Sequence, residues 1–96
     1  MVVLPNKASI DLEAVKRTLG PPSVSLVNRK DVEALTSQQM HGISPLGHDN
    51  ISILMDESLF EHSPVFVGTG RAGQELKIGP EQLRQIASAR KGIFSL

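Results

Sequence analysis

Short apolar runs and amphipathic stretches alternate along the chain, which is typical of a domain that mixes strands and helices. The unbroken apolar run at residues 2–4, closed by Pro5, predicts a strand that is covered on both faces and lies in the centre of a sheet. Residues 12–19 carry apolar side chains at helical spacing, with Asp11 as a suitable N-cap and Gly-Pro-Pro at 20–22 as the stop. The chain therefore opens with a predicted strand and a predicted helix.

A second strand and a second helix are predicted next. Residues 23–27 alternate between polar and apolar positions, which predicts a strand, and Asn28 is placed to cap a short helix that carries Val32 and Leu35. Residues 39–50 show no period and contain several Gly and Pro residues, which predicts a loop that is long for so small a domain. Long loops in compact domains often carry function, so this segment is a candidate site.

The second half of the chain predicts another strand and a hairpin. Residues 51–55 read as a strand, and the polar turn at 56–63 leads to a further apolar run at 65–67. After the glycine-rich residues 68–73, the alternation at 75–78 completes the hairpin.

A last helix is predicted to open at Gly79-Pro80, with proline in its first turn. Leu83 and Ile86 face inward in this helix, Gly92 ends it, and the tail at 93–96 carries no pattern. Because 96 residues with 40% hydrophobic content build one core, the whole chain is expected to be a single α/β (α+β) domain, residues 1–96.

Composition narrows the classes of function. Ten acidic and ten basic residues give a formal net charge of zero, so no global field draws the protein onto nucleic acid, and any RNA contact must be local. The absence of cysteine excludes disulfides and thiolate chemistry, and the three histidines lack metal-ligand spacing, so no metal site is expected. No stretch has the leader pattern of a secreted protein or the roughly 20 apolar residues of a membrane span, so a cytoplasmic protein without membrane contact is expected.

Residues 68–73 spell Gly-x-Gly-x-x-Gly directly after a predicted strand. A dinucleotide-binding turn would need a helix to begin within these glycines, whereas residues 74–78 alternate like a strand. Two interpretations stay open. The segment is either a flexible hairpin turn whose glycines permit positive φ, or a loop whose free N–H groups and Arg71 line a pocket for an anionic or carbonyl ligand.

The sequence His-Gly-Ile-Ser-Pro-Leu-Gly at residues 41–47 is the second candidate site. Gly42 would let a ligand approach the backbone, and Pro45 fixes φ on the far side. Glycine and proline are also common in ordinary loops, so a purely structural role for this segment is the alternative. Ser44 is poorly supported as a nucleophile, because no Gly-x-Ser-x-Gly elbow surrounds it and no base can be assigned.

Taken in order, these motifs resemble those of the YbaK/EbsC (YbaK/ProX-type) aminoacyl-tRNA editing deacylases over nearly the whole chain. The resemblance rests on the helix at 11–20, Gly-Ile-Ser-Pro-Leu-Gly at 42–47, Asp-Glu-Ser-Leu at 56–59, the hairpin at 65–78 and Gly-Pro-Glu-Gln-Leu at 79–83. The motif at 42–47 is the most specific of these. The resemblance implies a mixed β-sheet or partial barrel with flanking helices.

Members of this family hydrolyse the ester of wrongly charged aminoacyl-tRNA, notably tRNA for proline that carries cysteine or alanine. The resemblance therefore implies hydrolysis at the tRNA 3′ end without a cofactor, with tRNA and an aminoacyl-tRNA synthetase as partners. The catalytic residues stay unknown, with Gly42 and Thr69 as the candidates. The substrate-binding residues that it implies are His41, Gly42, Ile43, Ser44, Pro45, Gly68, Thr69, Gly70 and Arg71.

Two features depart from the family pattern. The family has an earlier segment with a catalytic lysine, which has no counterpart here, so the chain is interpreted as an N-terminally truncated member. His41 stands where many members have glycine, and Gly68 where some have serine or histidine. The alternative function is an inactive YbaK-like module that binds tRNA ends, a synthetase or a small ligand. The family's earlier segment would normally pair with or cover the first strand. Without that segment the strand would offer an open edge, so a homodimer is expected.

Overall fold

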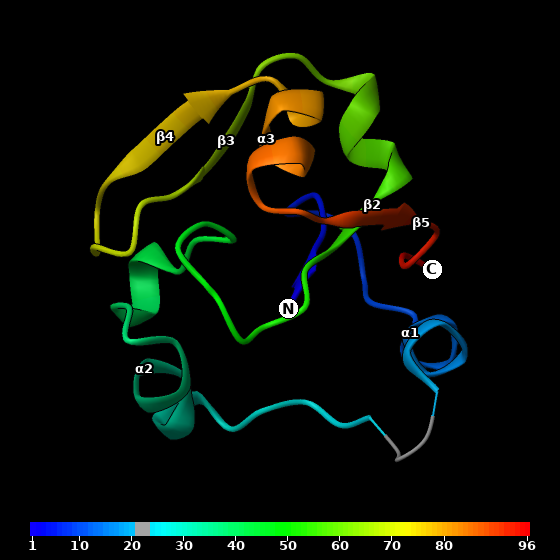
Figure 1. Cartoon of the computed structure of the whole chain (residues 1–96), viewed down its shortest axis with the longest axis horizontal. Helices are drawn as coiled ribbons and strands as arrows, with labels where there is room; N and C mark the ends of the chain where they lie inside the picture. Colours follow the sequence, from blue (N-terminus) through cyan, green and yellow to red (C-terminus); the bar gives the residue numbers. More distant parts are fainter. Residues whose placement is uncertain (21–23) are drawn as a thin grey trace.

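The computed structural model describes residues 1–20 and 24–96, which form helices and short strands in two separate sheets (Figure 1). The regular elements are, in chain order, β1 (Val2–Val3), α1 (Leu12–Leu19), α2 (Arg29–Thr36), the 3₁₀ turn η1 (Met40–Gly42), β2 (Leu54–Asp56), the 3₁₀ segment η2 (Glu57–Glu61), β3 (Val65–Gly68), β4 (Glu75–Ile78), α3 (Pro80–Ile86) and β5 (Arg90–Gly92). The mixed α/β class predicted from the sequence is confirmed, and neither sheet closes into a barrel.

The larger sheet is parallel, with β2 between β1 and β5. Leu54 of β2 lies opposite Val2 on one side and Arg90 on the other. The prediction that residues 2–4 form a central strand is therefore wrong, because in the described chain β1 pairs only with β2 and its two residues are half-buried. The apolar run at 2–4 forms only the two-residue strand β1, which lies at the edge of the sheet in the described chain.

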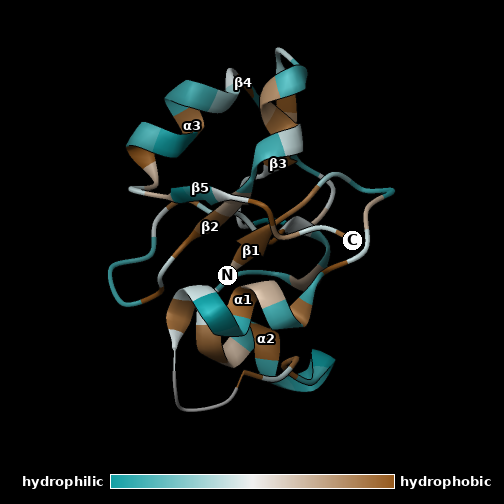
Figure 2. Ribbon diagram, turned by 90° about the vertical axis from the view of Figure 1, so that its right-hand side faces the viewer, coloured by the Kyte–Doolittle hydropathy of each residue, from teal (hydrophilic) through white to brown (hydrophobic). Residues whose placement is uncertain are grey.

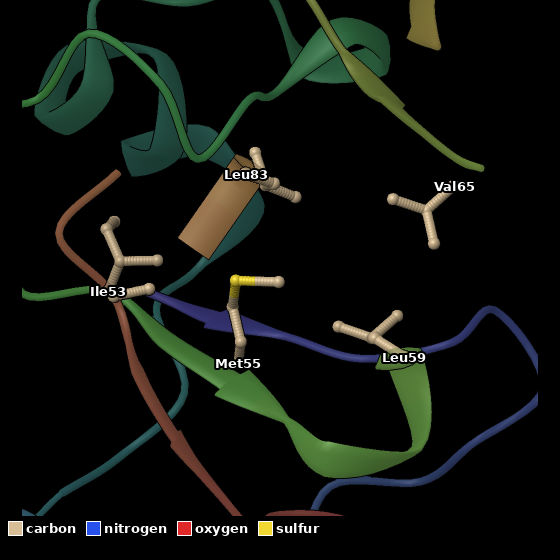
Figure 3. Packing of buried hydrophobic residues seen from close by; sticks show 6 residues of the cluster. Ile53, Met55, Leu59, Val65 and Leu83 are labelled. Atoms are coloured by element: carbon tan, nitrogen blue, oxygen red, sulfur yellow. The ribbon is translucent and has the colours of Figure 1, made fainter. Parts of the chain in front are cut away.

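Side chains of β2 point to both faces of this sheet, and each face carries its own core. Ile53 and Met55 pack with Leu59, Val65 and Leu83 beneath α3 and the hairpin (Figure 3). Leu54 points the other way, into a cluster with Ala14, Val15 and Phe94. Figure 2 shows the resulting layers, with α1 and α2 on one side of the sheet and α3 with the hairpin on the other.

The helix α1 and the β3–β4 hairpin form where the sequence predicts them, since both depend on local signals. The Asp11 carboxylate caps α1 by accepting from the Ala14 N–H at 3.2 Å, and Gly20 ends the helix at φ 74°. The prolines after Gly20, at 21–22, lie outside the described residues. The hairpin is antiparallel, with Val65 opposite Ile78 and Gly68 opposite Glu75. A strand at 75–78 also excludes the dinucleotide-binding interpretation of the glycines before it.

The segment before α2 does not form the predicted strand. Residue 23 lies outside the described residues, and residues 24–28 run without a strand partner, with Leu26 and Val27 both more than half exposed. The helix α2 forms as predicted after Asn28, but none of its residues is buried and Leu35 is 61% exposed. The alternation of polar and apolar residues before α2 therefore did not predict a buried strand.

The end of the chain also differs from the prediction. The helix α3 ends at Ile86, which is exposed, and Ser88 turns the chain at φ 52° so that residues 90–92 form β5 instead of a last helical turn. The predicted strand at 51–55 likewise begins later, at Leu54. Residues 93–96, which showed no pattern, contribute Phe94 to the core at 2% exposure.

Asp56, at the end of β2, holds this tail in place. Its buried carboxylate accepts hydrogen bonds from the Phe94 N–H at 2.7 Å and the Ser95 N–H at 2.9 Å, and from the N–H and hydroxyl of Ser58. Burial raises the pKa of Asp56, but the hydrogen bonds from Ser58, Phe94 and Ser95 lower it by more, so the pKa lies below its ordinary value. The carboxylate is thus a structural centre of the fold.

Candidate functional site

The two glycine-containing loops that the sequence singled out lie against each other. The Gly70 N–H donates to the Gly42 carbonyl at 2.6 Å, and the Gln39 N–H donates to the Gly70 carbonyl at 2.9 Å. Segments that are almost thirty residues apart therefore form one unit, which we call the paired loops (residues 41–46 and 68–72). All the residues singled out for substrate binding lie in these two segments.

Glycine is required where the paired loops meet. A Cβ atom at Gly42 would overlap the carbonyl of Arg71, and a Cβ atom at Gly68 would overlap the carbonyls of Ile43 and Gly42. The space beside Gly42, which the sequence suggested was kept for a ligand, is filled by the backbone of the opposite loop. That interpretation of Gly42 is corrected: the glycine permits close approach of protein to protein.

Ser44 is enclosed inside the first loop, with 1% of its surface exposed. Its N–H donates to Oε1 of Gln38 at 2.8 Å, its hydroxyl oxygen accepts from the Leu46 N–H at 3.1 Å, and its carbonyl lies 2.8 Å from Nε2 of His48. A carbonyl only accepts, so Nε2 of His48 carries the proton in this contact. The Ser44 hydroxyl is therefore a structural group, in agreement with its poor support as a nucleophile.

The candidate residues differ in what they can present to a ligand. Gly42, Ser44 and Pro45 are buried, whereas the side chains of His41, Thr69 and Arg71 are exposed on the rim of the paired loops. The remaining candidates, Ile43, Gly68 and Gly70, are half-buried. The side chains of His41, Thr69 and Arg71, which we call the rim residues, are therefore the ones that can contact a ligand directly.

A rim hydrogen-bond network fixes the loop that contains Thr69. The Thr69 hydroxyl donates to Oε1 of Gln74 at 3.2 Å and accepts from the Arg71 N–H at 3.4 Å. The Arg71 side chain has no acidic partner among the ion pairs of the described residues. It therefore offers a free cation beside the paired loops.

A groove of about 410 Å³ runs between the segment after β1 and the hairpin. Leu83 and Leu59 contribute apolar surface to it, and Glu75 brings a carboxylate to its wall. Val67 and Glu75 of its wall border Gly68 of the paired loops, which follows Val67 in the sequence and pairs with Glu75 across the hairpin. An apolar pocket of about 560 Å³ is lined by Ile43 of the paired loops and by Val32 and Leu35 of α2.

Sequence reasoning missed three residues that the structure places at the site. Gln38 and Gln39 make most of the side-chain contacts to the paired loops, and Glu75 links Gly68 to the groove. The two glutamines follow the C-cap of α2, Ser37, and no pattern of polarity marks them. Only the register of the hairpin reveals the position of Glu75.

Within residues 1–20 and 24–96, no three acidic or histidine side chains gather in a group that could hold a metal ion. In the same part of the chain, no helix has the length and apolar character that crossing a membrane requires.

Comparison with solved structures supports the same architecture. A hypothetical protein of known crystal structure superposes with a TM-score of 0.89 at 26% identity, over 99% of this chain and 63% of the other. The crystal structure described as a candidate trans-editing enzyme for prolyl-tRNA synthetase superposes with a TM-score of 0.85 at 23% identity, over 99% of this chain and 60% of the other. The fold is therefore that of YbaK-like editing enzymes.

Sequence comparison leads to the same group of proteins. A protein of Enterococcus faecalis (strain ATCC 700802 / V583), named as a candidate Cys-tRNA(Pro)/Cys-tRNA(Cys) deacylase, EbsC, is 24% identical over 91 residues. The match covers 94% of this chain and 56% of that relative, so the chain spans little more than half of the relative's length. The family profile of the aminoacyl-tRNA editing domain matches residues 1–86, and the chain belongs to this family.

Proposed function

We propose that the protein hydrolyses the ester bond that joins a wrongly attached amino acid to the 3′ end of tRNA. Water adds to the ester carbonyl, the bond between that carbonyl carbon and the ribose oxygen breaks, and the ribose oxygen takes up a proton. The products are the free amino acid and uncharged tRNA. We further propose that the substrates are tRNA(Pro)-like species and that the reaction takes place in the cytoplasm without a cofactor.

The observation that carries this proposal is a groove whose wall borders the paired loops. The groove is large enough for an aminoacyl group, and its wall at Val67 and Glu75 borders Gly68, the residue before the rim residue Thr69. We assign the Thr69 hydroxyl to positioning the ester and the Arg71 guanidinium to the phosphate of the terminal nucleotide. Gly42 contributes by allowing the loops to pack, and His41 stands on the rim beside it.

A second candidate function is favoured by a specific feature of the paired loops. The N–H groups of Gly42, Ser44, Gly70 and Ala72 all donate to acceptors within the protein. Donors that are already engaged do not stabilise an oxyanion. This favours a module that binds the tRNA end, a synthetase or a small ligand without hydrolysis.

A deacylation assay separates the two functions. The purified protein is incubated with a panel of mischarged tRNAs, and loss of the amino acid from tRNA is followed together with binding of the uncharged tRNA. We expect turnover on Cys-tRNA(Pro) or Ala-tRNA(Pro), and we expect Thr69→Val to lower kcat. Binding without turnover on every substrate would establish the non-hydrolytic module, and absence of both would contradict both proposals.

A further inference from the structure

We propose that Gln38 and Gln39 are the positioning residues of the site and that together they set the spacing and register of the paired loops. The inference rests on the proposed function, because positioning matters only for a substrate that the loops hold. Neither side chain has to touch that substrate. Their effect is on the loops that do.

Gln38 closes the first loop with both ends of its amide. Oε1 accepts from the Ser44 N–H at 2.8 Å, and Nε2 donates to the Leu46 carbonyl at 3.1 Å. The stem of the same side chain lies beside the second loop, since a Cβ atom at Gly70 would be 3.4 Å from Cγ of Gln38. One side chain therefore shapes the first loop and limits how closely the second approaches it.

Gln39 binds the second loop. Its N–H donates to the Gly70 carbonyl at 2.9 Å, and its Oε1 accepts from the Ala72 N–H at 2.6 Å. Its carbonyl accepts from the Gly42 N–H at 2.9 Å. Gln39 thus contacts both loops, on either side of the point where the Arg71 backbone meets Gly42.

The pair of glutamines is itself anchored to α2. The Gln38 N–H donates to Oγ1 of Thr36 at 3.2 Å, and the Met40 N–H donates to Oε1 of Glu33 at 3.0 Å. The helix buries none of its own residues, so these bonds are part of what joins it to the rest of the fold. We infer that α2 serves as the base from which the glutamines hold the loops.

The chemistry of the two amides predicts different responses to substitution. Gln39 uses only the acceptor of its side chain, so Gln39→Glu keeps the bond to Ala72, whereas Gln39→Met removes it. Gln38 uses donor and acceptor, so Gln38→Glu places a carboxylate oxygen against the Leu46 carbonyl and fails like Gln38→Met. Gln85→Met, at an exposed position on α3, is the matched control.

The expected effects at Gln39 fall on kcat more than on stability. Gln39 and Ala72 are exposed, so water replaces the lost bond at little cost, while the loops lose their fixed spacing. A displaced positioning group commonly lowers the rate by about 10-fold to 100-fold. We expect a loss of this size in Gln38→Met, Gln38→Glu and Gln39→Met, and near-parental kcat in Gln39→Glu and Gln85→Met. The melting temperature of Gln39→Met should stay close to that of the parent, whereas both Gln38 variants should also lose stability, because Gln38 bonds the N–H of the buried Ser44.

Hydrogen exchange at the Gly70 N–H gives a readout that needs no activity. The Gly70 N–H donates to the Gly42 carbonyl across the paired loops and not to either glutamine side chain, so its exchange reports on the spacing of the loops. Faster exchange at Gly70 in both Met variants, with recovery in Gln39→Glu, supports the inference. Unchanged exchange, or a loss of kcat in Gln39→Met that only follows a loss of thermal stability, overturns it.

The two proposals can fail separately. If the parent protein hydrolyses no mischarged tRNA, the proposed function fails, and the exchange of Gly70 then decides whether the glutamines set the loop spacing. If the parent is active and the Met variants keep their kcat, the function stands and the positioning role is wrong.

Discussion

The backbone of Arg71 occupies the space that a side chain at Gly42 would need, because a Cβ atom on Gly42 would overlap the Arg71 carbonyl oxygen. Both partners of this overlap are main-chain groups, so no rotamer change can relieve it. Gly42→Ala must therefore push the paired loops apart. We expect the free energy of unfolding to fall by about 1–3 kcal/mol, as for other overpacked sites.

The control for Gly42→Ala is Gly79→Ala. The new Cβ atom at position 79 would meet only the end of the Gln82 side chain, at 3.3 Å, and that side chain is free to move. Chemical denaturation of both variants measures the difference. Equal stabilities would show that the loops separate without cost and would contradict the close packing described here.

Asp56 predicts a loss of stability in acid. Its folded-state pKa lies below the ordinary value of 3.8, so its contribution is complete above that value and is lost as the pH falls through the folded-state pKa. Asp56→Asn keeps one acceptor oxygen for the N–H groups of Phe94 and Ser95 but turns an NH2 group towards the N–H of Ser58, which costs about 1–3 kcal/mol at neutral pH.

Melting temperatures of the parent and of Asp56→Asn between pH 7 and pH 3 test this prediction. The gap between the two proteins should be widest near neutral pH and should narrow as the parent carboxylate becomes protonated. A gap that stays constant over the whole range would mean that the ionised carboxylate does not stabilise the fold.

The tail is expected to be part of the core. Phe94→Ala removes a side chain that is 2% exposed and packs with Leu54 and Val15, so it should cost about 3–5 kcal/mol. Its neighbour Ile93 is 64% exposed, and Ile93→Ala should change stability by about 0.5 kcal/mol or less. Urea titration of this adjacent pair separates burial from any general effect of changing the tail.

The Arg71 side chain is expected to contact RNA phosphate. Arg71→Ala should weaken binding of the tRNA 3′ end. It should also reduce the slope of log K against log salt concentration by about one, the value for one lost phosphate contact. Lys91→Ala is the comparison, because Lys91 belongs to β5 and its Nζ lies 4.2 Å from the ring centroid of Phe60. Titrations at several salt concentrations that gave equal effects for both variants would remove Arg71 from the site.

The edge of β1 is expected to support a homodimer. In the described chain this strand pairs on one side only, which leaves main-chain donors and acceptors for a second copy. Light scattering coupled to size exclusion should give the mass of a dimer, and Val3→Lys should shift it towards the monomer while Leu26→Lys, outside β1, should not. A parent protein that stays monomeric at high micromolar concentration would disprove the expectation.

The sequence predicted those elements whose signals are local. Asp11 and Gly20 mark both ends of α1, and the glycines at 68–73 mark the turn of the hairpin. It failed where distant residues decide the structure. Phe94 is buried because its N–H reaches Asp56, 38 positions away, and β5 forms because residue 90 lies beside Leu54.

The candidate site was predicted in part, for the same reason. The glycines drew attention to two loops, and the structure brings these loops together, but the contact between them uses main-chain atoms. Main-chain contacts leave no pattern of polarity in the sequence, so the true neighbour of Gly42 could not be read from it. The role of Gln38 could not be read either, because its side chain bonds main-chain groups of Ser44 and Leu46. Whether the loops bind substrate stays a prediction.

Because the paired loops are joined through their backbones, their shape and their chemistry can change independently. Arg71 gives its carbonyl to the contact and its side chain to the solvent, and Thr69 likewise faces outward. Substitution of Arg71 would alter the charge of the rim while the main-chain contacts beneath it are preserved, whereas substitution of Thr69 would also remove the bonds of its hydroxyl to Gln74 and to the Arg71 N–H. New substrate preferences could thus be selected at Arg71 without rebuilding the main-chain contacts, whereas Gly42 and Gly68 have to remain glycine together.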